Sequence, residues 1–138
     1  MRLASSLLAA GLLALAACDA AEPPLEDGLS ATYALTYEVH GTYAACTIRY
    51  RTADYHTRAI EVKASAPGSL QWRYETPLRV SEIGGGFTAS VQATCADSVR
   101  TGKVTASVLV DRQVKATQTT ATYGATARAE STIGVGPR

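Results

Sequence analysis

Apolar and polar side chains alternate at every second residue along most of the chain from Tyr33 onward. In the run from Tyr33 to His40, the odd-numbered residues are aromatic or aliphatic and the others are mostly polar. A period of two places successive side chains on opposite faces of a β-strand, so one face of each run is suited to burial. Similar runs occupy residues 44–50, 60–63, 70–75, 87–95, 104–110 and 123–130, with a shorter one at Leu78 and Val80 after Pro77.

Turn signals separate these runs at intervals of roughly ten residues. Gly84–Gly86 predicts a turn, because residues without a Cβ atom adopt positive φ easily. A tight connection at Asp111–Arg112 returns the chain toward Val114, and no stretch has convincing helical periodicity. These features predict an all-β domain over residues 31–133, an antiparallel immunoglobulin-like sandwich of seven to eight strands, followed by a frayed tail at 134–138.

The first 17 residues have the composition of an export signal peptide. A positive start at Met1 and Arg2 precedes an apolar run from Leu3 to Ala14. That run is short for a bilayer span and contains two serines, which favours an export signal over a plain transmembrane anchor or a buried helix.

The residues that follow, Leu15 to Cys18, resemble the lipobox of bacterial lipoprotein signals. The resemblance implies cleavage before Cys18 and acylation of its thiol, so that lipid holds the protein to a membrane of the bacterial cell envelope, facing the periplasm. Asp19 resembles an inner-membrane retention signal, although the inner and the outer membrane both stay possible locations. Residues 18–30 are acidic, contain two prolines and lack periodicity, which predicts a short lipidated tether.

The charge balance excludes one class of partner. The formal net charge is +1, and removal of Arg2 with the signal leaves twelve basic and twelve acidic side chains. A neutral chain is poorly suited to electrostatic capture of a phosphate backbone, so no nucleic-acid partner is expected.

Two cysteines, Cys46 and Cys95, are left after Cys18. Both fall on the apolar side of their alternating runs, and an exported domain meets an oxidising compartment. A disulfide is favoured over two free thiols. With Trp72 between them in sequence, the pair is similar in order to the inter-sheet disulfide and packed indole of immunoglobulin domains.

The sequence contains few residues suited to catalysis near neutral pH. His40 and His56 are the two histidines, and their positions at a strand end and in a loop favour solvated side chains. Asp54 and His56 offer two metal ligands, but no third ligand in the sequence nearby completes a site. Motifs of hydrolases, metalloproteases and phosphate-binding loops are absent from the sequence. We therefore expect no enzyme, no cofactor and no metal.

Tyrosine and arginine side chains gather in the predicted loops and strand faces between residues 43 and 58. These two residue types are enriched among interface hot spots. Each side chain taken singly is better explained as a cover for the core, whereas the group as a whole is the best candidate for a binding surface. The candidate binding surface comprises Tyr43, Arg49, Arg51, Tyr55, His56 and Arg58.

Four segments resemble the small β-sandwich of the MmpS (mycobacterial membrane protein small) type, which occurs in transport accessory proteins and bacterial lipoproteins. They are residues 37–41 (YEVHG), 48–50 (IRY), 70–72 (LQW), and 104–111 with 123–125 (YGA), in the family's order over residues 33–132. Gln71 replaces the proline of LPW, Arg112 replaces the glycine of an Asp-Gly hairpin, and the two cysteines have no family counterpart. The resemblance implies this fold and a noncatalytic accessory role.

Together these features predict a lipid-anchored envelope protein that binds another protein or a lipidic ligand, as an accessory to an envelope transport complex. The alternative is an envelope inhibitor of a lysozyme or protease that acts through a projecting loop, for which residues 51–57 and Gly84–Gly86 are the candidates.

Overall fold

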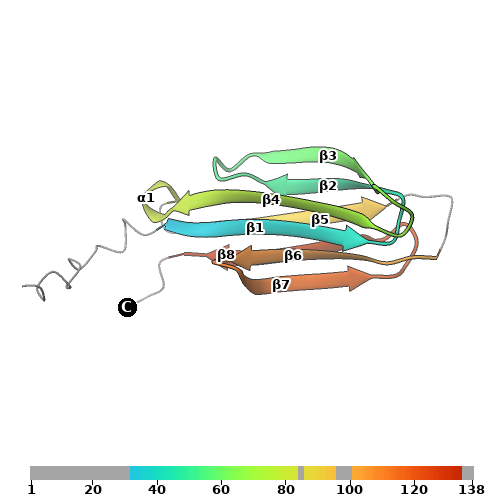
Figure 1. Cartoon of the computed structure of the whole chain (residues 1–138). Coiled ribbons are helices and arrows are strands. Elements are labelled where there is room, and N and C mark those ends of the chain that lie inside the picture. The colour runs from blue at the N-terminus through green and yellow to red at the C-terminus, as the bar shows by residue number, and fades with distance from the viewer. Residues whose placement is uncertain (1–31, 84–85, 96–100, 135–138) are drawn as a thin grey trace, which may run out of the picture.

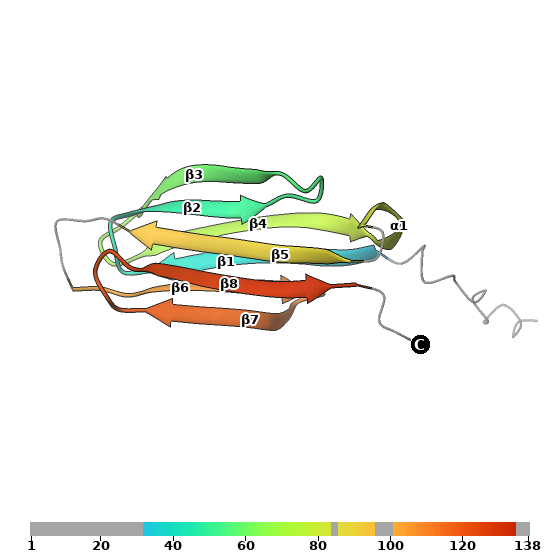
Figure 2. The same ribbon diagram turned by 180° about the vertical axis from the view of Figure 1, so that it is seen from behind.

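The computed structural model describes residues 32–83, 86–95 and 101–134. Within them, two antiparallel four-stranded sheets form a sandwich, which confirms the predicted all-β fold with eight strands (Figures 1 and 2). The predicted signal (1–17), the lipidation site Cys18, the tether (18–30), Gly84, Gly85 and residues 135–138 of the predicted tail lie outside the described residues.

The first sheet has the strand order β4-β1-β6-β7 and the second has the order β3-β2-β5-β8. The first sheet contains β1 (Thr32–Gly41), β4 (Leu70–Arg79), β6 (Val104–Val110) and β7 (Gln113–Thr120). The second contains β2 (Ala45–Arg51), β3 (Thr57–Lys63), β5 (Phe87–Cys95) and β8 (Thr126–Ile133).

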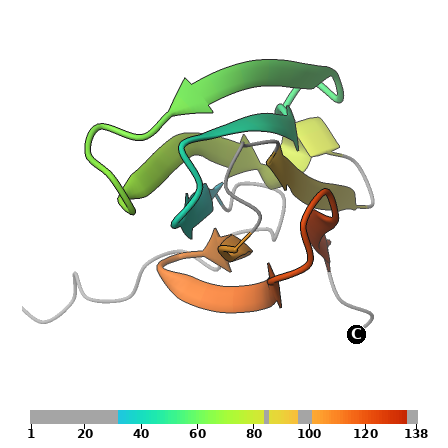
Figure 3. The same cartoon turned by 90° about the vertical axis from the view of Figure 1, so that its right-hand side faces the viewer.

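The core lies between the two layers and is built from the apolar side of each alternating run (Figure 3). Leu35, Tyr37 and Val39 of β1 are buried against the layer that contains Ile48 and Phe87. Because alternate residues of a strand face opposite sides, the same periodicity leaves the outer faces of both sheets polar.

The segment around Pro77 differs from the prediction of a separate short strand. Pro77 lies inside β4 opposite Ala34, and Leu78 continues the same strand. Val80 instead begins α1 (Val80–Ile83), a helix of one turn where no helix was expected. β4 is an edge strand, and an edge strand accepts proline because a residue there need not donate to a ladder.

The predicted tight connection between β6 and β7 is confirmed. Asp111 and Arg112 both have positive φ, 51° and 69°, as a two-residue hairpin turn with the twist of the flanking strands requires. The Asp111 carboxylate accepts a hydrogen bond from the Ala34 N–H (2.9 Å), and the Asp111 N–H donates to the Ala34 carbonyl (2.8 Å). The turn is therefore tied to β1.

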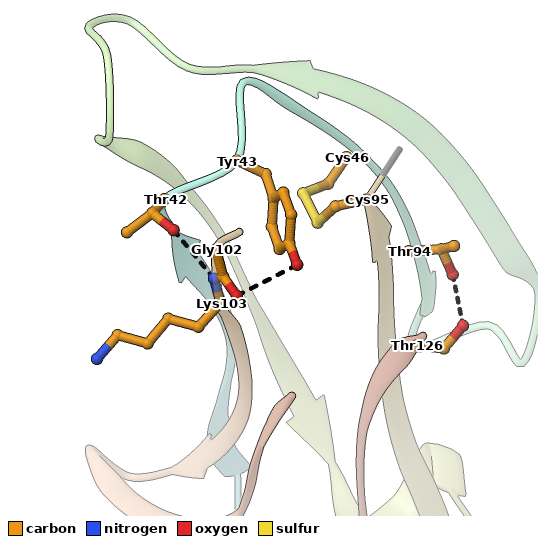
Figure 4. The surroundings of a disulfide bond; sticks show 8 residues. All are labelled: Thr42, Tyr43, Cys46, Thr94, Cys95, Gly102, Lys103 and Thr126. Carbon is orange, nitrogen blue, oxygen red and sulfur yellow. Dashed lines mark hydrogen bonds between the residues drawn. A yellow bond between two sulfur atoms is a disulfide. The ribbon is translucent and has the colours of Figure 1, made fainter. Parts of the chain in front are cut away.

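The expected disulfide between Cys46 and Cys95 is present (Figure 4). The two residues face each other on β2 and β5 of one sheet, so the bond does not join the two sheets as it does in immunoglobulin domains. Trp72 lies in the other sheet and packs on Tyr50 and Tyr74. Sequence order alone gave no information about the register that brings the two cysteines together.

We expect the disulfide to provide a large share of the stability of this small domain. The double variant Cys46→Ala/Cys95→Ala should lower the free energy of unfolding by up to about 4 kcal/mol, since the bond closes a loop with a separation of 49 residues. Urea unfolding measures the loss, and the reduced wild-type protein should show the same loss. Recovery of two alkylatable thiols from native protein would contradict the assignment.

Candidate functional site

Tyr43 does not belong to an exposed binding surface. Its ring is 2% exposed and lies next to the disulfide, where its hydroxyl donates to the Gly102 carbonyl (3.2 Å; Figure 4). The ring closes the core at the end of the sandwich opposite the β2–β3 loop, which contains Tyr55 and His56 (Figure 1). The predicted grouping of Tyr43 with these residues is therefore corrected.

Arg49 and Arg51 lie on the outer face of the second sheet, where two further strands add polar side chains. Arg49 on β2 is opposite Gln92 on β5, and Gln92 is opposite Arg128 on β8. Neighbouring strands are about 4.8 Å apart, and β5 lies between β2 and β8, so the Cα atoms of Arg49 and Arg128 are about 10 Å apart. Ser90 of β5 lies one position further along this outer face. We call Arg49, Arg51, Ser90, Gln92 and Arg128 the basic groove.

The basic groove is hollowed. A depression of about 320 Å³ is lined by all five of its residues, together with Tyr55 and Glu130. A second depression of about 540 Å³ shares Arg49 and Gln92 with the first, continues toward Thr47 and Thr94, and is also lined by Glu61. The two depressions form one path along the sheet from the Tyr55 end toward the disulfide end.

The arginines of the basic groove are only partly neutralised. Arg128 pairs with Glu130 (2.7 Å between Nη2 and Oε2), and the Arg51 guanidinium lies 5.3 Å from the centre of the Tyr55 ring. Within the described residues, Arg49 makes no ion pair, and its cross-strand neighbours are Ala59 and Gln92. The groove therefore presents a net positive charge to solvent.

The loop between β2 and β3 is held in place by Tyr55. This residue has a φ of 68°, and its hydroxyl donates to the Ile83 carbonyl (2.9 Å), with the Gly86 carbonyl 3.3 Å away. Its ring meets Phe87 edge to face at 5.5 Å. These contacts fix the loop against the end of α1 and the start of β5.

Asp54 and His56 form a pair within this loop. The Asp54 carboxylate accepts a hydrogen bond from the Thr52 hydroxyl and lies 3.1 Å from Nδ1 of His56. The Thr52 hydrogen bond, and then that of His56, lower the pKa of Asp54 to about 2. In the part of the chain that the structure describes, no group of three potential metal ligands occurs. The Thr52 hydroxyl also donates to the His56 carbonyl (3.0 Å), and the Thr52 N–H donates to the same carbonyl (2.8 Å), so these hydrogen bonds order the loop.

Arg58, the last of the predicted residues, points away from the basic groove. Arg58 on β3 is opposite Tyr50 on β2, and Tyr50 faces the core, so Arg58 lies on the core-facing side of β3. It belongs to a different surface from Arg49 and Arg51.

Tyr37 connects the core to the basic groove. Its buried hydroxyl donates to the Arg51 carbonyl (2.8 Å) and accepts a hydrogen bond from the Ser90 N–H (3.3 Å), so a residue of the first sheet positions the backbone of the second. Burial raises the pKa of Tyr37 well above its usual range, which keeps the phenol neutral and able to donate.

Sequence reasoning missed Ser90, Gln92 and Arg128 as members of the basic groove. All three were recognisable as polar positions of alternating runs, but only the register of β2, β5 and β8 places them beside Arg49. A sequence pattern specifies the face of a strand and not its neighbour.

No protein-family model matches the chain, and no curated protein is significantly similar to it. The resemblance to the MmpS type therefore stays a prediction. Among the described residues, no helix has the length and apolar character needed to cross a membrane.

We expect Tyr37→Phe to lower the free energy of unfolding by about 1–3 kcal/mol, because the Arg51 carbonyl and the Ser90 N–H lose a buried partner. Chemical denaturation measures the loss, and faster amide exchange at Ser90 should accompany it. Tyr33→Phe is the matched control, since Tyr33 lies on the same side of β1 and is half-buried. Similar losses in the two variants would contradict a role for the hydroxyl.

Proposed function

We propose that the protein is a lipid-anchored, noncatalytic binding protein of the cell envelope that assists an envelope transport complex and contacts a protein partner through the basic groove. The observation that carries this proposal is the hollowed outer face of the second sheet, where three arginines outnumber the two carboxylates, Glu61 and Glu130, that line the two depressions. The lipobox-like sequence ending at Cys18 supports the anchored location.

The chemistry of the basic groove is suited to recognition of an acidic surface. Guanidinium groups bind carboxylates and phosphates through two parallel hydrogen bonds, and Arg49 has this capacity free of any ion pair among the described residues. Gln92 and Ser90 add directional hydrogen-bonding groups between the arginines. A partner segment with carboxylates about 10 Å apart would match the spacing of Arg49 and Arg128.

The position of the groove suits an anchored domain. β1 begins at the same end of the sandwich as the β2–β3 loop and α1 (Figure 1). The basic groove starts at that end, beside Tyr55, and continues along the outer face of the second sheet toward the disulfide end. The predicted tether would allow up to about 40 Å between membrane and domain, at roughly 3.3 Å per residue. A partner in the envelope can then approach the side of the domain.

The β2–β3 loop supports the second candidate, an inhibitor of an envelope lysozyme or protease. An inhibitory loop benefits from a fixed conformation, because less conformational freedom is lost on binding. Tyr55 and the Asp54–His56 pair fix this loop, while the His56 side chain is 75% exposed. The two candidates therefore use different residues and can be separated by variants.

Membrane attachment through lipid predicts that Cys18→Ser releases the protein into the soluble fraction. The reason is that the variant lacks the thiol that the lipobox resemblance assigns as the acylation site. Fractionation of cells followed by immunodetection measures the distribution, with the wild-type chain as reference. Sedimentation of the variant with membranes would contradict lipid anchoring at this residue.

Partner binding through the basic groove predicts that Arg49→Glu lowers capture of the partner roughly tenfold, because a repulsive charge replaces a charge-assisted hydrogen bond. A photo-crosslinking side chain at exposed Thr47, which lines the same path, reports the capture in cells. Lys115→Glu makes the same charge change on the other sheet and should leave the yield unchanged.

Two outcomes would count against this assignment. Equal yields from the wild type and Arg49→Glu would contradict the groove as the contact surface. A large loss with His56→Ala and none with Arg49→Glu would favour the inhibitor instead.

A further inference from the structure

The side of the sandwich between β3 and β4 is open. β7 and β8 pack together at the other side, whereas β3 and β4 touch at few positions (Figure 3). Ile60 lies on the core-facing side of β3, opposite fully buried Ile48 on β2. Ile60 is nevertheless 42% exposed. β3 therefore extends beyond the sheet that would cover it.

Three aromatic rings lie on this side of the sandwich. The Tyr50 ring of the second sheet lies 5.0 Å from Trp72 and 4.7 Å from Tyr74 of the first sheet, measured between ring centres. The rings of Trp72 and Tyr74 are nearly parallel, with an angle of 7° between their planes. All three residues are half-buried, so each ring packs on the core and retains some exposed surface.

A single cation lies at one end of this apolar surface. Arg58 is opposite Tyr50 and on the same side of β3 as Ile60 and Val62. It is exposed and forms no ion pair within the described residues. The strip from Arg58 to Val62 is about 13 Å long, at roughly 3.3 Å per residue. We call the whole surface the open edge; it comprises Tyr50, Arg58, Ile60, Val62, Trp72 and Tyr74.

We propose that the open edge binds a single-chain amphiphile with an anionic head, of the fatty-acid class. The hydrocarbon chain lies along Ile60 and Val62 and over the aromatic rings, where burial of apolar area on both sides drives binding. The carboxylate lies at Arg58, the one cation of the surface. Charge complementarity selects this occupant, because an apolar strip with one positive end matches an apolar chain with one negative end.

The open edge and the basic groove lie on opposite faces of the second sheet, and Tyr50 of the open edge also lines the depression of the groove. The groove lies on the outer face of the second sheet, and the open edge lies on the core-facing side of β3 in the same sheet. Ligand binding at the open edge therefore does not depend on the proposed protein partner, and it adds a lipidic ligand to the binding capacity of the domain.

Trp72 provides the readout, because it is the only tryptophan of the chain. Titration of the full chain with dodecanoate below its micelle concentration should change the Trp72 emission until it saturates. Dodecyltrimethylammonium has the same chain with a cationic head and should bind at least tenfold more weakly. Arg58→Ala should weaken dodecanoate binding roughly tenfold and remove this preference.

Substitutions at Ile60 test the apolar half of the surface. Ile60→Asp should abolish the saturable change, and the milder Ile60→Ala should weaken it, with circular dichroism as the check on folding. Val114→Asp is the matched control, because Val114 is 58% exposed on the other sheet. Arg49→Glu should also bind dodecanoate normally, which separates this test from that of the basic groove.

Three results would overturn the proposal. The first is no saturable change with dodecanoate, and the second is an equal response in the wild type and both Ile60 variants. The third is self-association of the ligand-free chain in sedimentation that Ile60→Asp removes, which would identify a second copy as the occupant.

Discussion

Burial of one row of side chains from each strand between the two sheets is the constraint on which the structure depends. Leu35, Tyr37 and Phe87 are each almost completely buried, and a buried side chain of this size contributes about 1.5–3 kcal/mol. A shift of one residue in any strand pair would expose that row and bury the polar one, so this packing also fixes the register. The disulfide and the Tyr37 hydroxyl then act within a register that the core has already selected.

On the outer faces of the sheets, the side chains that stabilise the strands differ from those that we propose for binding. Cross-strand hydroxyl pairs such as Thr94–Thr126 (2.7 Å) and Thr105–Thr119 (2.6 Å) hold neighbouring strands together, each worth about 0.2–1 kcal/mol. Arg49 forms no such pair with its cross-strand neighbours, Ala59 and Gln92, among the described residues. A charged side chain that the fold does not require is available to a partner.

The period of two was sufficient to predict the fold class, because it identified which side of each strand is buried. It was not sufficient to predict which side chains surround Arg58, Ile60 and Tyr43. Ile60 lies on the expected side of β3, but no strand of the first sheet covers it, and coverage depends on how far the two sheets overlap. Tyr43 is in a connection that reads as a loop, yet its ring completes the core at the disulfide end.

Tyr37 links the two surfaces that we propose for binding. Its hydroxyl holds the backbone of Arg51 and Ser90 in the basic groove, while its ring stacks on Tyr74 of the open edge at 6.2 Å. A change in the position of this one side chain would therefore move residues on both surfaces, because interiors at protein packing density transmit displacements. Arg49 and Ile60, in contrast, are exposed and lie on opposite faces of the second sheet. Substitutions at these two positions therefore separate the surfaces functionally, whereas substitutions in the core between them would affect both.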